Sequence, residues 1–206
     1  MIHVFHGFLG SPNDFDFLPH RKDIKCHDLS SDLNINLQPD DTLIGYSMGG
    51  RLALDLAAKA EFKIKRLVLI NAHPGFSTED EKVTRRQWEG LIEQKLLDEN
   101  FMSYWNSLPI FKGDSPLSEM SPEKLLNSRK IFQKLRLSAQ KDYLPEIEKQ
   151  LDKVFWIIGL QDEKYCGLAE RDLLPRGIRC RFIDGGHRLF QHPTSLLRVL
   201  NEEGVL

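Results

Sequence analysis

The sequence has little cysteine: Cys26, Cys166 and Cys180 lie far apart and form no C-x-x-C pair. This odd, scattered set argues against a disulfide framework and against a zinc site. A signal peptide and a long apolar run are also missing, because the first residues, MIHVFH, include no cationic region and no cleavage site. We therefore expect a soluble cytoplasmic protein with buried thiols, no bound metal and no membrane partner.

An excess of charge of either sign is missing as well. The 28 lysines and arginines nearly balance the 30 aspartates and glutamates, which leaves a formal net charge of -2. Such a chain has no general attraction for nucleic acid or anionic membranes, so any anion site has to be local. The chain has no repeats, and 206 residues with 41% hydrophobic content suit one compact domain.

Short apolar runs alternate with segments of helical periodicity, which is typical of a parallel sheet covered by helices. The runs span residues 2–5, 24–27, 42–45, 67–71, 154–159 and 179–183. Ser11-Pro12 predicts a short helix that ends near Leu18, and the apolar spacing over residues 48–59 predicts a longer one. The expected fold class is α/β, with a mostly parallel sheet of about six strands and helices on both faces.

The strand pattern stops between residues 76 and 150, where helical segments begin with capping signals such as Ser77-Thr78 and Ser121-Pro122. Strand signals precede and follow this stretch closely. We therefore expect residues 1–206 to form a single domain, in which residues 76–150 are an inserted helical cap or lid over the ends of the sheet.

The connection between the second and third strands, residues 29–41, is too short and loop-like for a crossover helix. One face of the sheet is therefore expected to be thinly covered. Leu33, Ile35 and Leu37 could fill the uncovered patch, or a second subunit could cover it. The oligomeric state that we expect is a monomer or a weak homodimer.

The residues Gly45-Tyr46-Ser47-Met48-Gly49 form a G-x-S-x-G motif between a predicted strand and a predicted helix. In this context the serine sits on a strained turn, and the flanking glycines let strand and helix approach closely. Its hydroxyl then projects into a site. The motif predicts that Ser47 is a catalytic nucleophile or base.

A serine hydroxyl needs a base, and a neutral imidazole needs a carboxylate that holds its tautomer. Asp162 and His187 follow the last two predicted strands, at the sheet edge to which Ser47 points. They are the predicted partners. Alternatives remain, which are Asp184 or Glu163 for the acid and His192, His73 or His6 for the histidine.

Charge that develops on a substrate oxygen requires backbone donors, and the best placed amides are those of Met48 and Phe8. Met48 begins the helix after the serine, where the helix dipole is positive. Phe8 lies in the glycine-bracketed loop that follows the first strand. That loop could also be an ordinary strand-to-helix turn.

Several motifs together resemble the α/β-hydrolase superfamily and, within it, the 2-succinyl-6-hydroxy-2,4-cyclohexadiene-1-carboxylate (SHCHC) synthases, the pyruvate-eliminating lyases of menaquinone biosynthesis. The motifs are HGFLGS at residues 6–11, GYSMGGRLAL at 45–54, NAHPGF at 71–76, RQW at 86–88, F-x-x-x-W-x-x-x-P-x-F at 101–111, GLQDEKY at 159–165 and GGHRLF at 185–190.

The resemblance implies a triad of Ser47, Asp162 and His187, with the amides of Phe8 and Met48 as donors. The implied reaction removes a proton beside the succinyl carbonyl, stabilises the enolate and expels pyruvate, with no water and no cofactor consumed.

The implied substrate is a small polycarboxylate with three carboxylates, so the resemblance also implies a set of cations. Arg51 matches one family arginine and Arg129 a second. A third could fall on Arg86, Arg85 or Lys82, and Tyr46 and Trp105 match aromatic residues of the pocket.

Two other functions stay open. The same triad could serve a small carboxylesterase or carbon-carbon bond hydrolase, and the fold could serve a non-catalytic ligand-binding protein. Residues 28–31 also depart from the Asp-Leu-Pro-Gly-His-Gly loop of many relatives, so the resemblance predicts the catalytic mechanism rather than the pocket shape or the substrate.

Overall fold

The computed structural model describes residues 1–30 and 35–206. Within these residues six strands form one parallel sheet in the order β2-β1-β3-β4-β5-β6. The strands are β1 (Ile2–Phe5), β2 (Ile24–His27), β3 (Thr42–Tyr46), β4 (Arg66–Ile70), β5 (Val154–Gly159) and β6 (Arg179–Ile183). Their bounds agree with the predicted runs to within one residue at each end. The parallel sheet expected from the sequence is confirmed.

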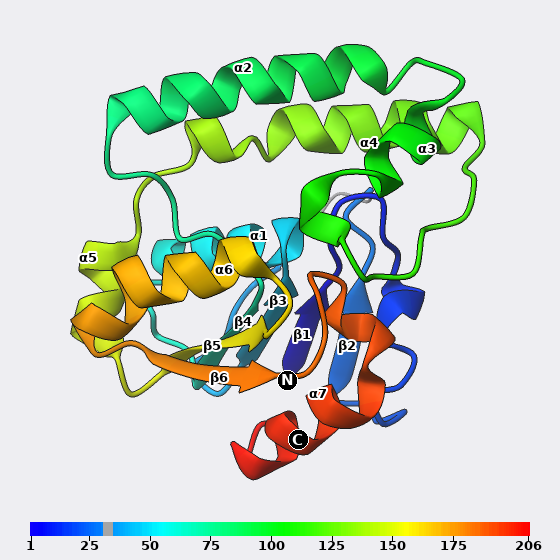
Figure 1. Ribbon diagram of the computed structural model, residues 1–206. Coiled ribbons are helices and arrows are strands. Elements are labelled where there is room, and N and C mark those ends of the chain that lie inside the picture. The colour runs from blue at the N-terminus through cyan, green and yellow to red at the C-terminus, as the bar shows by residue number, and fades with distance from the viewer. Residues whose placement is uncertain (31–34) are drawn as a thin grey trace.

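Helices cover both faces of this sheet (Figure 1). The helices are α1 (Met48–Lys59), α2 (Glu79–Lys95), α3 (Phe101–Asn106), α4 (Pro122–Lys134), α5 (Leu144–Ile147), α6 (Glu163–Leu168) and α7 (Pro193–Glu202). Helix α1 has the predicted bounds. The helix expected to reach Leu18 is shorter, a 3-10 turn over Pro12–Phe15, and Leu18 packs beyond it as a buried loop residue.

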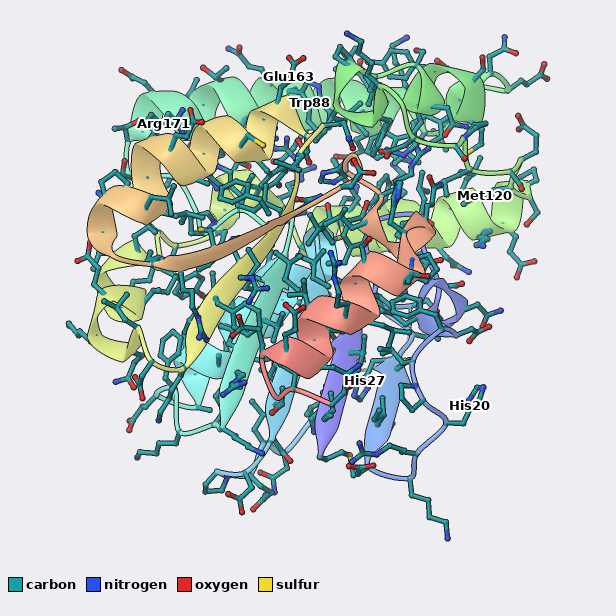
Figure 2. The ribbon with its side chains drawn as sticks, turned by 60° about the horizontal axis from the view of Figure 1, so that its bottom comes forward. His20, His27, Trp88, Met120, Glu163 and Arg171 are labelled. Atoms are coloured by element: carbon teal, nitrogen blue, oxygen red, sulfur yellow. The ribbon has the colours of Figure 1, made fainter. Side chains whose placement is uncertain are left out.

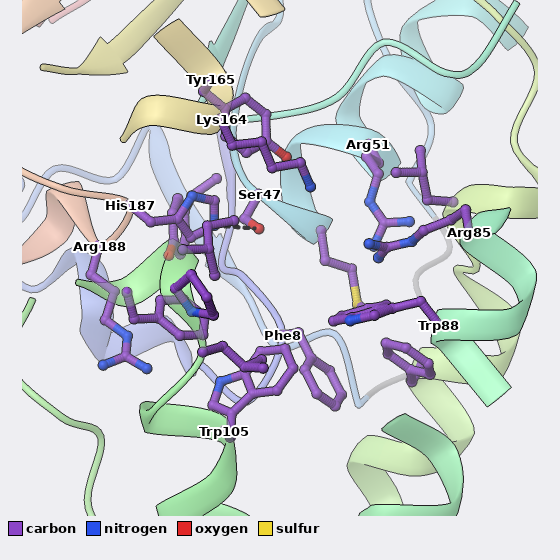
Figure 3. Close-up of a pocket in the computed structure, with 18 of the residues that line it drawn as sticks. Phe8, Ser47, Arg51, Arg85, Trp88, Trp105, Lys164, Tyr165, His187 and Arg188 are labelled. Atoms are coloured by element: carbon purple, nitrogen blue, oxygen red, sulfur yellow. Dashed lines mark hydrogen bonds between the residues drawn. The ribbon is translucent and has the colours of Figure 1, made fainter. Parts of the chain in front are cut away.

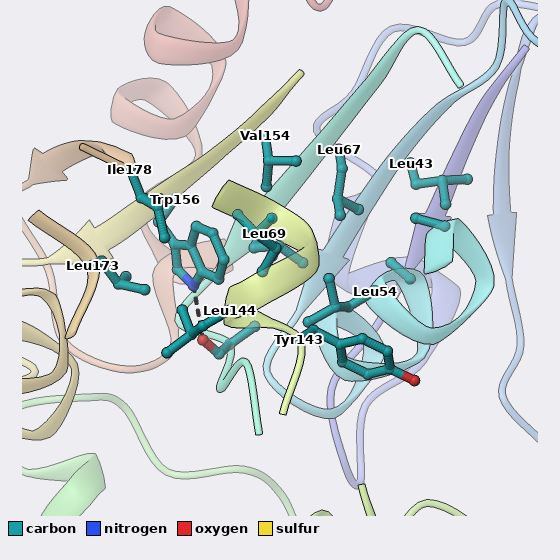
Figure 4. Packing of buried hydrophobic residues seen from close by; sticks show 14 of the residues in the cluster. Leu43, Leu54, Leu67, Leu69, Tyr143, Leu144, Val154, Trp156, Leu173 and Ile178 are labelled. Carbon is teal, nitrogen blue, oxygen red and sulfur yellow. Dashed lines mark hydrogen bonds between the residues drawn. The ribbon is translucent and has the colours of Figure 1, made fainter. Parts of the chain in front are cut away.

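The strands are apolar on both faces because both are covered. Leu67 and Leu69 of β4 face α1 and α5, whereas Val68 and Ile70 face α7. Figure 4 shows the first of these layers, with Leu54 of α1 packed beside the strands. Burial of one such leucine contributes about 1.5–3 kcal/mol. Successive residues of a strand point to opposite faces, so their alternation decides which helices each one packs against.

The connection between β2 and β3 contains no helix in its described part, as expected from its length. Ile35 and Leu37 are partly buried and pack against the apolar layer that contains α1, together with the buried Leu29. Leu33, the third residue expected there, lies outside the described residues. The patch is therefore filled at least partly by the chain itself.

Helices α2, α3 and α4 lie across the end of the sheet (Figure 1). Thr78 and Ser121 cap α2 and α4 at the predicted positions. These helices enclose a separate apolar cluster that also contains Leu9 and Met48 from the sheet side. In Figure 2, Trp88 belongs to this end of the molecule, whereas His27 lies along the sheet. The division into one domain with a cap over residues 76–150 stays a prediction.

Among the described residues, no helix combines the length and the apolar character that crossing a membrane requires.

Candidate active site

Ser47 stands on a sharp turn between β3 and α1. Its φ of 51° and ψ of -111° are unusual for a residue with a Cβ, and such a conformation costs about 1–3 kcal/mol. A hydrogen bond from the Ser47 amide to the Ile70 carbonyl, 2.9 Å long, fixes the turn. A Cβ on Gly45 would collide with the backbone of α1, and one on Gly49 would collide with β1. The glycines therefore allow the contact that exposes the serine.

His187 and Asp162 lie beside Ser47 in one chain of hydrogen bonds. The Nε2 atom of His187 is 3.1 Å from the Ser47 Oγ, and its Nδ1 is 2.6 Å from an oxygen of Asp162. Both partners are almost fully buried. The second oxygen of Asp162 accepts a hydrogen bond from the Tyr165 amide, so the carboxylate also caps α6. The structure brings the three predicted residues together in the predicted order.

The alternative histidines lie elsewhere. His6 accepts a hydrogen bond from the Leu29 amide, His73 accepts one from the Gly75 amide, and His192 precedes α7.

The alternative acids are also occupied elsewhere or exposed. Asp184 accepts a hydrogen bond from Gln161, and Glu163 is an exposed residue at the start of α6. His187 is hydrogen-bonded to Ser47, and Asp162 is hydrogen-bonded to His187.

Phe8 and Met48 both line the cavity beside Ser47. Among the described residues, neither amide has an acceptor, so both stay available to a ligand. The loop that carries Phe8 is held by His6, whose Nδ1 bonds the Gly7 carbonyl and whose Nε2 accepts from Leu29. The two residues whose amides are predicted as donors thus line the same cavity as the serine.

The cavity has a volume of about 640 Å³ and lies between the end of the sheet and the helices above it. Tyr46 and Trp105 both line it, as predicted. The Tyr46 ring lies 5.4 Å from that of His187, and Trp105 stands edge-on to Phe8 at 5.1 Å. Each aromatic ring therefore also packs against a predicted site residue, His187 or Phe8.

Arg51 from α1 and Arg85 from α2 are two of the arginines that line this cavity. Arg51 is buried and donates to the Leu135 carbonyl at 2.7 Å. Burial and the nearby charge of Arg85 lower the pKa of Arg51 to about 10. Arg85 pairs with the buried Glu89 at 2.9 Å and stacks over Trp88. Both guanidinium groups are held by protein contacts before any ligand arrives.

The other predicted cations lie outside the cavity. Arg86 pairs with Glu79 on the exposed side of α2, and Arg129 of α4 pairs with Glu93. Neither they nor Lys82 line the cavity, so the structure does not bring Arg86 and Arg129 together with the three residues at Ser47, and their role in substrate binding stays a prediction. Successive helical residues point about 100° apart, which is why Arg85 rather than Arg86 faces inward.

Sequence reasoning missed three residues of the site. Lys164 and Arg188 line the cavity, although both belong to motifs quoted for other residues. Arg188 is 2% exposed and donates to the Ser115 carbonyl and to Asn106, which ties the helical end to the His187 loop. The buried Asn71 donates to the His187 carbonyl at 2.9 Å. The available signal was the position next to His187 for Arg188 and the position at the end of β4 for Asn71, whereas Lys164 had no such signal.

Comparison with known proteins agrees with this architecture. Residues 5–101 match the profile described as the alpha/beta hydrolase fold. The solved structure of MenH from S. aureus superposes with a TM-score of 0.72 at 23% identity, over 99% of this chain and 94% of that one. The chain therefore has the α/β-hydrolase fold, as predicted.

Relatives found by sequence similarity indicate a narrower group of proteins within this fold. A Bacillus subtilis (strain 168) protein, named as a candidate SHCHC synthase, is 30% identical over 140 residues, 62% of this chain. The match spans about half of that relative, 51%. A Haemophilus influenzae protein with the same candidate name is 26% identical over 84% of this chain and 85% of its own length. The chain is thus a homologue of proteins named as SHCHC synthases, which confirms the resemblance.

Proposed function

We propose that this protein is a carbon-oxygen lyase that eliminates pyruvate from a 5-enolpyruvyl-6-hydroxy-2-succinyl-cyclohexene-carboxylate and yields SHCHC, a step of menaquinone biosynthesis. One observation carries the proposal: the hydrogen-bonded Ser47, His187 and Asp162 open on a cavity that also holds Arg51 and Arg85. The names of the homologues agree with this combination of a base and an anion site.

Each member of the site has a role in that reaction. His187, oriented by Asp162, takes the proton of the Ser47 hydroxyl, and the resulting oxyanion removes a proton from the carbon beside the succinyl carbonyl. The amides of Phe8 and Met48 donate to the enolate oxygen as charge develops there.

The enolate then returns its electrons through the ring. A carbon-carbon double bond forms and the bond between the ring and the enolpyruvyl oxygen breaks. The departing enolpyruvate gains the proton that protonated His187 returns and becomes pyruvate. Atoms and electrons balance without water, metal or redox cofactor. Arg51 and Arg85 hold carboxylates of the substrate, for which a guanidinium is suited.

The helical segment over residues 76–150 is proposed to act as a lid that excludes water from this chemistry. Water exclusion matters because a reactive enolate would otherwise be protonated by solvent. Arg188 supports this role, because its bonds to Ser115 and Asn106 connect the segment to the catalytic histidine loop.

The test is pyruvate release from the enolpyruvyl substrate by the full chain. Ser47→Ala is expected to lower kcat at least about 100-fold, because it removes the proton-abstracting group. Ser103→Ala, on an exposed position of α3, is the matched control and is expected to leave kcat unchanged. Equal turnover by Ser47→Ala and wild type would refute the proposal.

A small carboxylesterase or carbon-carbon bond hydrolase is the second candidate, since the same triad could attack an ester. The cations of the cavity favour the lyase, because a neutral ester has no carboxylate for them to bind. Rapid turnover of p-nitrophenyl esters without pyruvate release would favour the esterase. If the wild type binds the substrate but does not turn it over, a non-catalytic binding protein would be favoured.

A further inference from the structure

Three cations from three different helices line one side of the cavity. They are Arg51 of α1, Arg85 of α2 and Lys164 of α6 (Figure 3). In that view they stand to one side of Ser47, and Arg188 lies on the other. The proposed anion site is therefore built around more than the two arginines already described.

The three cations differ in the protein groups that they contact. Arg85 has the carboxylate of Glu89, and Arg51 has the carbonyl oxygen of Leu135. Among the described residues, Lys164 has no hydrogen bond and no ion pair, and its contact is a cation-π approach to Tyr165 at 5.4 Å. A cation without an anionic partner, on the wall of a substrate cavity, is available to a ligand.

The groups that face Lys164 come from every neighbouring element. Tyr165 lies on its own helix, and Asp162 caps that helix. Arg51 lies on α1, Arg85 on α2 and His73 after β4. Asp80 and Glu81 line the same cavity from the first turn of α2. Burial holds the pKa of His73 well below 6.5 and raises that of Tyr165, so both stay neutral around pH 8.

Lys164 is exposed as a whole residue, but its ammonium lies close to other cations of the cavity wall. Desolvation by surrounding atoms and repulsion by Arg85 and Arg51, opposed by attraction to Asp162, lower its pKa to about 8. Lys164 therefore loses its proton before Arg51, whose pKa is lowered only to about 10. A bound carboxylate would reverse the desolvation cost and raise the lysine pKa again.

We propose that Lys164 binds a carboxylate of the substrate, and that its charge state sets the affinity of the cavity for polycarboxylates. Protonated Lys164 completes a three-cation site with Arg51 and Arg85, and neutral Lys164 leaves that site incomplete. This inference rests on the proposed function only in that the ligand carries several carboxylates. Lys164 is thus assigned as a substrate-binding residue that proton binding regulates.

The test is calorimetric binding of 2-succinylbenzoate to the full chain. This probe is the aromatic compound that loss of water from SHCHC produces, and it carries two carboxylates but no leaving group. With a lysine pKa near 8, the protonated fraction falls from about 0.9 at pH 7 to about 0.1 at pH 9. If the neutral lysine weakens binding about 10-fold, wild-type affinity is expected to fall about 5-fold between these pH values.

Proton uptake gives a second reading that a merely structural lysine would not produce. Titrations at pH 8 in two buffers of different ionisation enthalpy are expected to show uptake of about half a proton per bound probe. Lys164→Arg is expected to bind at pH 7 like the wild type, to lose most of the pH dependence and to take up no proton. Lys164→Gln is expected to bind about 10-fold more weakly at pH 7, also without pH dependence.

Lys82→Gln is the matched control, because Lys82 lies on α2 outside the cavity. It is expected to bind and take up protons like the wild type. Wild-type affinity of Lys164→Gln at pH 7, or full pH dependence in Lys164→Arg, would overturn the inference. Pyruvate release is measured separately, so failure of the lyase assay with intact linked binding would refute the proposed function alone.

Discussion

Replacement of Asn71 should damage both stability and catalysis, because this one side chain joins the segments that carry the acid and the histidine. Its Nδ2 donates to the carbonyls of Gly186 and His187 at 3.1 and 2.9 Å, and its Oδ1 accepts from the Gly159 amide at 3.1 Å. The side chain is fully buried. Its φ of 42° also lies in the left-handed region, which asparagine tolerates better than alanine.

The expected cost of Asn71→Ala follows from these contacts. Three buried hydrogen bonds at about 1 kcal/mol each correspond to about 3 kcal/mol of unfolding free energy. The backbone conformation adds about 1 kcal/mol. For a chain of this length the melting temperature should fall by about 10 °C. A shift of His187 by about 1 Å would also lower kcat by about 100-fold.

Urea unfolding and steady-state kinetics measure the two effects separately. Asn71→Asp is the second variant, because aspartate tolerates the same backbone conformation and still accepts from Gly159 but faces two carbonyls with no donor. Asn201→Ala, which removes one exposed hydrogen bond on α7, is the control and should cost less than about 0.5 kcal/mol. An Asn71→Ala protein with wild-type midpoint and kcat would refute the reasoning.

Two further predictions concern the elbow and the sheet. Gly49→Ala should lower the free energy of unfolding in urea by at least about 3 kcal/mol, because the new Cβ would collide with the His6 carbonyl. Gly90 has open space where a Cβ would lie, so Gly90→Ala should raise the free energy of unfolding by about 1 kcal/mol. Burial first, and the charge of His3 next, lower the pKa of His27 from 6.5 to about 4. Between these pH values the unfolded state therefore binds more protons than the folded state. The free energy of unfolding should fall by up to about 3 kcal/mol as the pH drops from 6.5 to 4. His27→Gln should make the free energy of unfolding less dependent on pH in this range.

The buried segments and the triad could be predicted from the sequence for local and topological reasons. Apolar runs between turn signals predicted the strands, because a strand covered on both faces has to be apolar throughout. Ser47, Asp162 and His187 each follow a predicted parallel strand, and the carboxyl ends of such strands meet at one edge. Their proximity therefore required the correct order of elements and no detailed packing.

The tertiary structure alone decided which cations face the cavity. Arg85 and Arg86 are adjacent and chemically identical, and the rotation of α2 about its axis, set by its packing, turned the first inward and the second to solvent. Lys164 carries no local signal that separates it from a solvated lysine. Asn71 bonds partners 88 or more positions away in the chain. Periodicity reports which residues are buried, whereas the direction of a polar side chain depends on distant partners that only the fold assembles.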